Sequence, residues 1–507
     1  MPRFEIQPLE GRVFLSAALP LAASSDDVAG PIAPSQLVVD QTPPSLIPGD
    51  DTPSESLGAS VRPTLVNRIG DATLKAQLDP LKNSPAAFDQ ALLNHMRAVT
   101  TDRFFFGPAN AGDLAARLAF ISAGSLQNSA VANADNIMLH RFPQQSGAAY
   151  NVQVADTIDF DNTSYSTNEE FLPHLNRFEH WVELGQAYLY TNDTDYVQEM
   201  VNQLSSFALQ APAANPATWA STGGVSWDLL SASLRVGEWI WAYQMVLNSP
   251  TWSKEANTLF VSRLWEHGDF MNRAVPYEAT SNRALFHAKS EMMLAQVFPE
   301  LLGAASWETA GRARMFAAMD AQLYNDGSHV EQSPNYTNLV IEDVLEAKWL
   351  DEINGDLYTW PAAYNTKINN AIESYRQMLS PDASNPAIGD TYRNVSVTMF
   401  TKGALIQDLI TVKTSAVNDA AAATYPGPPY AQTALKVDDA TQFAVGDQIH
   451  LESRNEVMLV TGVNLGTNTL TVQRGYGGTP AQQWNDNTTI YNVGNMTVAR
   501  ARVRDVY

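Results

Sequence analysis

Hydrophobic positions recur with helical spacing from about residue 64 to residue 413. Between Phe171 and Tyr190 the large apolar side chains fall on one broad stripe, as an amphipathic helix requires. Short segments rich in Gly, Pro and Asn separate this stripe from others like it. The other predicted helices are Trp227–Val246, Ala256–Met271, Ala284–Phe298, Thr309–Leu323 and Val340–Leu350.

Repeated helical hairpins over residues 64–413 predict a mainly α protein. We expect these hairpins to form an α/α toroid, which is an incomplete barrel of helical hairpins. The concave face of such a toroid offers a groove for an extended ligand. A parallel sheet within this region would contradict the prediction.

Period-two alternation replaces the helical spacing after Val412 and predicts a small all-β module over residues 433–493. Residues 24–63, rich in Pro, Ser and Asp, and residues 414–432 are predicted linkers, because such compositions bury too little apolar surface to offset the entropy of ordering. Residues 494–507 form a tail or the start of a further region. The predicted strands are Leu435–Val437, Gln448–Leu451, Glu456–Val463, Thr469–Gln473 and Thr489–Asn492.

Charge and composition exclude several classes of protein. Among 507 residues, 54 acidic side chains against 31 basic ones give a formal net charge of −23. Such a balance argues against nucleic acid or an anionic membrane as a partner. The absence of cysteine excludes disulfides, thiolate metal sites and cysteine nucleophiles. No run of 18 apolar residues is present, so no membrane-spanning helix is expected, and no motif indicates a metal or another cofactor.

The N-terminus carries a candidate export segment at residues 1–23. Val13–Ala23 is a short apolar stretch that ends in small residues, as in the hydrophobic part of a signal peptide. Before it, Leu9-Glu10-Gly11-Arg12 resembles the Leu-Glu-x-Arg export signature of planctomycete-type surface and extracellular proteins. The resemblance implies a secreted, cell-surface or periplasmic protein.

Two groups of motifs carry a further resemblance. The first is the run Phe171-Leu-Pro-His-Leu-Asn-Arg-Phe-Glu-His-Trp181, continued by Trp227, Arg235 and Trp239. The second is an Asn at a helix start followed by an Asp-Gly turn and a Glu-x-Ser-Pro-x-Tyr run, here Asn282, Asp326-Gly327 and Glu331–Tyr336, with Gly389-Asp390 beyond it. In this order the motifs resemble those of the heparinase II/III-like polysaccharide lyases, which include alginate-lyase-type and heparinase-type toroids. The resemblance spans residues 95–410.

The resemblance implies β-elimination on an acidic polysaccharide that contains uronic acid. Such a reaction removes the proton next to the uronate carboxylate, which must be neutralised so that the developing negative charge is stabilised. Carried over to this sequence, Asn282 would bind the carboxylate and Tyr336 would act as general base and then general acid. Arg283 stands where family members often have His, and His287, four residues later on the same helical face, would supply an imidazole. We expect these side chains to face one groove.

Each of these residues also has a purely structural interpretation. Asn282 would cap a helix, Tyr336 would be a core aromatic, and His287 would be a packed side chain. His329 and Glu331 would form a turn and cap network that supports Tyr336, or would contact substrate. The predicted substrate-binding residues of the first motif group are Asn176, Arg177, His180, Trp227 and Arg235. All of them except Trp227 are most simply interpreted as polar ties between helices.

Two other functions stay open. A glycoside hydrolase on the same toroid would use paired carboxylates such as Asp326 and Glu331 about 5–10 Å apart across a groove. A non-catalytic surface protein would bind the glycan and release nothing. Family lyases also continue into a large β domain with a His-x-His segment, and nothing like it follows Gly389-Asp390. We therefore expect a weak or inactive lyase.

Overall fold

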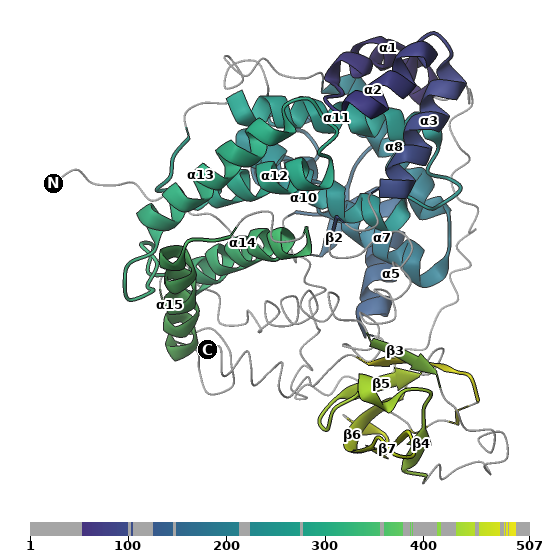
Figure 1. Ribbon diagram of the computed structural model, residues 1–507. Helices are drawn as coiled ribbons and strands as arrows, with labels where there is room; N and C mark the ends of the chain where they lie inside the picture. The colour runs from purple at the N-terminus through teal and green to yellow at the C-terminus, as the bar shows by residue number, and fades with distance from the viewer. Residues whose placement is uncertain are drawn as a thin grey trace, which may run out of the picture.

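The computed structural model describes two parts of the chain, one helical and one built of strands (Figure 1). In the helical part it describes residues 53–99, 103–104, 125–144, 149–211, 224–273, 277–354 and 359–378. In the C-terminal part it describes residues 386, 388, 413–416, 432–451, 456–476, 481, 483–484 and 486–492. The predicted export segment, the Gly389-Asp390 motif and the predicted tail lie outside the described residues.

The described residues are mainly helical, which confirms the predicted fold class at that level. Up to residue 211 the helices are α1 (Pro53–Arg68), α2 (Ala72–Leu78), the 3-10 turn η1 (Asp79–Leu81), α3 (Pro85–Val99), α5 (Ser125–Met138), α6 (Phe171–Arg177), α7 (His180–Thr191) and α8 (Asp195–Gln210). Beyond it they are α10 (Leu229–Val246), α11 (Lys254–Arg273), α12 (Arg283–Val297), α13 (Ala304–Gln322), α14 (Pro334–Ile353) and α15 (Ala362–Met378). A short antiparallel hairpin, β1 (Arg141–Pro143) with β2 (Tyr150–Gln153), was not predicted.

The predicted linker 24–63 is wrong at its C-terminal end, because residues 53–63 belong to helix α1. The helix begins at Pro53, and proline is well suited to the first position of a helix because that N–H has no intrahelical partner. Near its other end, Arg62 forms a buried ion pair with Asp89 of α3, with 2.5 Å between Nη2 and Oδ2. Helix α1 also packs against α11, far away in sequence (Figure 1). These tertiary contacts outweigh a local composition that is poor in helix formers.

The helix predicted over Phe171–Tyr190 is interrupted. Helix α6 ends at Arg177, and α7 begins at His180. Between them Phe178 adopts a left-handed backbone conformation with φ of 61°. Its ring is fully buried and stacks on that of Phe160 at 5.1 Å. Aromatic packing therefore selects a backbone conformation that the spacing of apolar residues does not reveal.

Helix α10 lies at the centre of the helical part. Almost every side chain from Leu230 to Val246 is buried, and the helix packs against α6, α7, α11 and α12. A helix surrounded in this way has no solvent face, so its polar side chains must find partners inside the protein. No helix in the described part of the chain is long and apolar enough to cross a membrane.

The C-terminal part contains the predicted β module. Its sheet is antiparallel, with strand order β3-β8-β5-β6-β7-β4. The five predicted strands agree within one residue, and the apolar face of the sheet covers a separate core that includes Leu435, Ile449 and Val460. An additional edge strand, β3, lies mostly inside the predicted linker 414–432. The strands are β3 (Lys413–Ala416), β4 (Ala434–Lys436), β5 (Gln448–Leu451), β6 (Val457–Asn464), β7 (Thr469–Gln473) and β8 (Thr489–Asn492).

Candidate active site

Helices α12 and α14 pack side by side and run in the same direction. Lys289 of α12 pairs with Asp343 of α14, and further along both helices Gln296 donates to Asp351. Because the residue numbers rise together on both helices, their N-terminal ends lie at the same end of the pair. Asn282 stands at the N-terminus of α12 and Tyr336 stands in the first turn of α14. The structure therefore brings this predicted catalytic pair to one end of two adjacent helices.

Asn282 occupies the N-cap position of α12 without capping it. Its side chain makes no hydrogen bond to the first turn, which excludes the simple capping role. The residue is 3% exposed, and its Oδ1 atom has no hydrogen-bond partner among the residues that the structure describes. A buried amide oxygen that is left unsatisfied destabilises a protein by about 1–3 kcal/mol. Such an atom is a candidate for contact with a ligand.

Tyr336 lies two residues after Pro334, which begins α14. Proline at this position suits the helix start. Tyr336 therefore lies in the first turn of α14, directly after the loop from His329 to Ser333. Tyr336 is 4% exposed, so its surroundings are almost dry. Electrostatic interactions are stronger in such a site than in water.

Arg283 and Arg177 bring positive charge to this region. Arg283 is the first residue of α12 and is exposed. Arg177, the last residue of α6, is buried, and its Nη1 atom lies 3.0 Å from Nε2 of His174. Burial lowers the pKa of Arg177, and the nearby positive charge of Arg283 lowers it further, against the opposing effect of acidic neighbours such as Glu179. The charge of Arg283, in the second motif group, therefore acts on Arg177, in the first.

Gln322, the last residue of α13, joins the segments that precede the two helices. Its Nε2 atom donates to the carbonyl oxygens of Ala279 and Ser281 at 2.7 and 2.8 Å. Its Oε1 atom lies 3.3 Å from Nε2 of His329. Gln322 opens the segment of the second motif group that leads through Asp326-Gly327 to Tyr336, but it was not among the predicted site residues.

His329 supports the turn before α14, as one of its two interpretations requires. Its Nδ1 atom accepts the backbone N–H of Glu331 at 3.4 Å, so the ring proton belongs on Nε2, facing Gln322. Burial lowers the pKa of His329 to about 4, so the imidazole is neutral at neutral pH. The side chain of Glu331 itself is exposed. Substrate contact by either residue stays a prediction.

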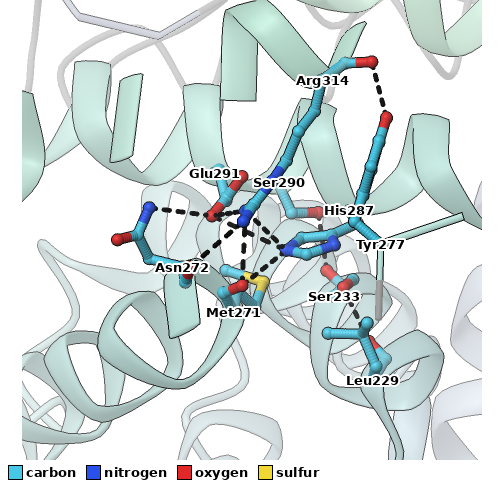
Figure 2. A network of polar contacts seen from close by, with 9 residues as sticks. All are labelled: Leu229, Ser233, Met271, Asn272, Tyr277, His287, Ser290, Glu291 and Arg314. Carbon is cyan, nitrogen blue, oxygen red and sulfur yellow. Dashed lines mark hydrogen bonds and ion pairs between the residues drawn. The ribbon is translucent and has the colours of Figure 1, made fainter. Parts of the chain in front are cut away.

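His287 belongs to a buried polar network at the C-terminal end of α11 (Figure 2). Its Nε2 atom lies 2.8 Å from the carbonyl oxygen of Met271. Arg314 of α13 donates to the carbonyl oxygen of Asn272 and to Oε1 of Glu291, and it lies over the ring of Tyr277. Arg314 of α13 thus donates to the last carbonyls of α11, and His287 of α12 packs against the same helix end.

The second ring nitrogen of His287, Nδ1, is buried and has no partner among the described residues. Its Nε2 atom, by contrast, lies within the network of Figure 2. In this arrangement His287 ties α12 to α11. Its proposed role as a catalytic imidazole stays a prediction.

Arg235, Asn176 and Trp227 lie in the core between helices. Arg235 is fully buried, and it donates to Nε2 of His267 at 2.9 Å and to the carbonyl oxygens of Asn176 and Ser226. Burial lowers its pKa to about 9. Its guanidinium also lies over the ring of Trp227, 5.7 Å from the centroid. These contacts are those of a tie between helices, and they leave substrate binding by this group as a prediction.

His180 is likewise buried at the start of α7. Its Nε2 atom lies 2.8 Å from Oε1 of Gln203, and its ring stacks on Phe178. Burial lowers the pKa of His180 to about 4, so the ring is uncharged at neutral pH. A neutral, enclosed imidazole contributes little attraction for an anion.

Similarity to known proteins supports the family that the motifs resemble. The family model described as Heparinase II/III N-terminus matches residues 82–406. The chain therefore belongs to the heparinase II/III family. The match covers well over half of the chain and includes every predicted catalytic and substrate-binding residue.

Curated relatives and solved structures extend the similarity. A heparin-sulfate lyase of Bacteroides stercoris is 26% identical over 302 residues, which are 55% of this chain and 45% of that protein. A second, from Bacteroides thetaiotaomicron, is 24% identical over 224 residues, 44% of this chain and 31% of that one. This chain thus spans less than half the length of these relatives. A crystal structure of heparinase III superposes with a TM-score of 0.54 at 18% identity, over 85% of this chain and 65% of that one, and so shares the fold.

Proposed function

We propose that this protein is a polysaccharide lyase that cleaves a uronic-acid-containing glycan by β-elimination, on a helical frame of the α/α toroid type. The family, the shared fold and the placement of Asn282 and Tyr336 at one end of α12 and α14 support the proposal. The observation that carries it is the buried Asn282 side chain, which does not cap its helix and whose Oδ1 atom lacks a partner among the described residues.

An amide in this state suits a uronic acid group. Its N–H donates to one oxygen of the acid, and its Oδ1 accepts the proton of the other. Two such hydrogen bonds hold the carboxyl group in its neutral form. Negative charge that develops on the adjacent carbon then spreads onto this group, and preorganised donors of this kind typically contribute a factor of about 100–1,000 in rate.

Tyr336 would carry the proton. Its phenolate takes the proton from the carbon next to the carboxyl group, a carbon–carbon double bond forms, and the bond to the neighbouring sugar oxygen breaks. The same tyrosine returns the proton to that oxygen, which leaves as a hydroxyl group. An ordinary tyrosine has a pKa near 10, so ionising it at pH 7 costs roughly 4 kcal/mol. The positive charges of Arg283 and Arg177 would reduce this cost.

The substrate that fits best is an acidic glycosaminoglycan. The two Bacteroides relatives are named heparin-sulfate lyases, and the basic pair Arg177 and Arg283 would attract the carboxylate or sulfate groups of such a chain. A local basic pair is needed because the whole protein carries a formal net charge of −23. Such a polymer lies outside the cell, in agreement with the proposed export segment at residues 1–23.

The test is the formation of unsaturated uronate, followed by its ultraviolet absorbance, on a panel of heparan sulfate, heparin, hyaluronan, chondroitin sulfate and alginate. We expect product from at least one glycan, loss of turnover in Tyr336→Phe, and a fall of about 100-fold or more in Asn282→Ala. Tyr243→Phe is the matched control, because it also removes one buried tyrosine hydroxyl, here bonded to Asn257 at 2.8 Å. Binding of glycan without any unsaturated product would favour the non-catalytic alternative.

The glycoside hydrolase alternative requires a carboxyl group that stays protonated near neutral pH, and this calls for a raised pKa. Asp326 has the opposite property. It accepts the Oγ–H and the backbone N–H of Ser328 at 2.7 and 2.9 Å, and these hydrogen bonds lower its pKa. Asp326 therefore suits a turn better than an acid catalyst. Saturated reducing ends as the only products would reverse this preference.

A further inference from the structure

Helices α12 and α14 are joined by a buried ionic cluster two turns below the candidate site. The Nζ atom of Lys289 lies 2.8 Å from Oδ1 of Asp343 and 2.8 Å from Oε2 of Glu346. All three residues are no more than 5% exposed. Trp241 of the central helix α10 donates to the other oxygen of Glu346 at 2.9 Å. One ammonium group thus holds two carboxylates of the neighbouring helix, inside the protein.

The position of this cluster fixes the relation between the two candidate catalytic residues. Lys289 lies seven residues after Asn282, and Asp343 lies seven residues after Tyr336. Because the helices are parallel, equal offsets from the ion pair place Asn282 and Tyr336 at the same level, roughly 10 Å above it at 1.5 Å per residue. The candidate pair and the ion pair therefore share one register.

Apolar packing alone would define this register weakly. The surfaces that meet here are rich in flexible or small aliphatic side chains, which tolerate repacking; they include Leu285, Ala288, Met292, Val340, Ile341, Val344 and Ala347. A buried ion pair adds little net stability compared with apolar residues of the same size, but breaking it leaves uncompensated buried charge. A slip of one helix along the other would break at least one of the two ion pairs of Lys289 and leave a buried carboxylate uncompensated. The cluster therefore favours the observed register, in which both pairs form.

We propose that Lys289, held by Asp343 and Glu346, is a positioning residue that sets the register of α12 on α14 and thereby the separation of Asn282 from Tyr336. The catalytic consequence rests on the proposed lyase function, whereas the geometric consequence does not. Lys289 itself touches no reacting atom in this scheme. It acts through the two helices.

The principal test replaces the cluster by uncharged side chains in the full chain, with Lys289→Met, Asp343→Leu and Glu346→Gln together. Glutamine keeps an acceptor for Trp241. We expect the midpoint of urea unfolding to stay near that of the native protein, while kcat falls by about 100-fold with KM unchanged, as for a misplacement on the order of 1 Å. Unchanged kcat in a folded triple variant would overturn the proposal. Should the triple variant not fold, Asp343→Asn serves in its place, because it weakens one of the two ion pairs at constant shape. A native value of kcat in Asp343→Asn would likewise overturn the proposal.

Arg62→Met is the matched control for loss of a buried cation. Arg62 pairs with Asp89 between α1 and α3, and it is 4% exposed. This variant removes a comparable ion pair without touching α12 or α14. We expect it to lower stability but to leave kcat of the folded protein unchanged. An equal loss of kcat in this control would show that the effect is general destabilisation rather than lost register.

A distance measurement separates failure of this proposal from failure of the lyase assignment. The chain contains no cysteine, so Arg283→Cys and Glu331→Cys, both at exposed positions, accept one nitroxide label each. We expect a narrow distribution of distances between the labels in the native background. In the triple variant it should broaden or shift by about 1.5–5 Å, the rise of one residue to one turn. Identical distributions would overturn the register proposal even if no glycan is cleaved.

Discussion

Gln322 and His329 are joined through a hydrogen bond of 3.3 Å between Oε1 and Nε2, and this contact links the loop before Asn282 to the turn before Tyr336. The same amide donates to the carbonyl oxygens of Ala279 and Ser281. A single fully buried glutamine therefore connects both ends of the candidate site. This glutamine and the proposed register of α12 on α14 would both position Asn282 relative to Tyr336.

Gln322→Leu should lower both stability and turnover. The change removes the partner of two partly buried carbonyl oxygens and of the buried ring N–H of His329, which destabilises the protein by about 1–3 kcal/mol. Urea unfolding measures this loss, and the unsaturated-uronate assay measures kcat. Gln244→Leu is the control, because Gln244 is equally buried but its amide atoms have no partner among the described residues. A larger loss of stability for Gln244→Leu than for Gln322→Leu would contradict this account.

Gly327→Ala should destabilise the turn between α13 and α14. Gly327 has φ of +84°, and a Cβ atom there would lie 1.9 Å from the carbonyl oxygen of Asn370 in α15. That oxygen is backbone, so it cannot move aside as a flexible side chain would. We expect a loss of several kcal/mol and a lower melting temperature by calorimetry. Gly466→Ala in the β module, where nothing lies closer than 3.4 Å, should change stability little.

The sequence predicted the regular parts of the fold well. The strands of the β module were visible because they alternate with period two between glycine turns. The edge strand β3 was missed because Lys413-Thr-Ser-Ala416 is short and polar and pairs with β8 from the other end of the module. The break at Phe178 was missed because it arises from contacts with Phe160 and Trp239, far away in sequence.

The candidate site was only partly predictable for the same reason. Asn282 and Tyr336 stand in recognisable local motifs, so the sequence identified them. Arg314 bonds to Glu291, 23 residues away, and Gln322 donates to Ala279, 43 residues away, and no local pattern reveals these partners. Lys289 is the one lysine or arginine of the mostly apolar segment Ala284–Val297. A charge in that position must find a buried partner, and it finds two on α14.

Acid should destabilise the protein through its buried imidazoles. Burial lowers the pKa of His329 to about 4 from an ordinary value of 6.5. The unfolded chain therefore binds a proton at a pH where the folded protein does not, and stability falls as the pH falls from about 7 towards 4. Between pH 7.5 and pH 5 this amounts to roughly 2 kcal/mol.

The variant His329→Gln isolates this effect. Glutamine does not titrate, so the free energy of unfolding of the variant should fall less between pH 7.5 and pH 5 than that of the native protein, by about the same roughly 2 kcal/mol. His180, whose pKa is also lowered to about 4, remains in both proteins and cancels in the comparison. Equal pH dependence in the two proteins would show that His329 is not held neutral.

Glu183 should have the opposite effect. Its carboxylate accepts the hydroxyl of Tyr150 from the hairpin and the Nδ2–H of Asn133 from α5, at 2.8 Å for the latter. Burial nevertheless raises its pKa to about 7 from an ordinary value of 4.5, and the negative charge of Glu179 adds to this shift. The folded state therefore retains a proton that the unfolded chain has lost. Stability is higher below about pH 4.5 and falls as the pH rises through 7, by roughly 2–3 kcal/mol between pH 5 and pH 8.

Glu183→Gln tests this sign. Glutamine can accept from Asn133 through Oε1 and donate to the Tyr150 oxygen through Nε2, and it carries no charge at any pH. Its free energy of unfolding should exceed that of the native protein at pH 8 and approach it at pH 5, as measured by urea unfolding at both values. Glu308→Gln is the control, because Glu308 is partly exposed in its ion pair with Arg312. A native-like slope between pH 5 and pH 8 in Glu183→Gln would mean that Asn133 and Tyr150 keep the carboxylate ionised, and that the two hydrogen bonds outweigh burial.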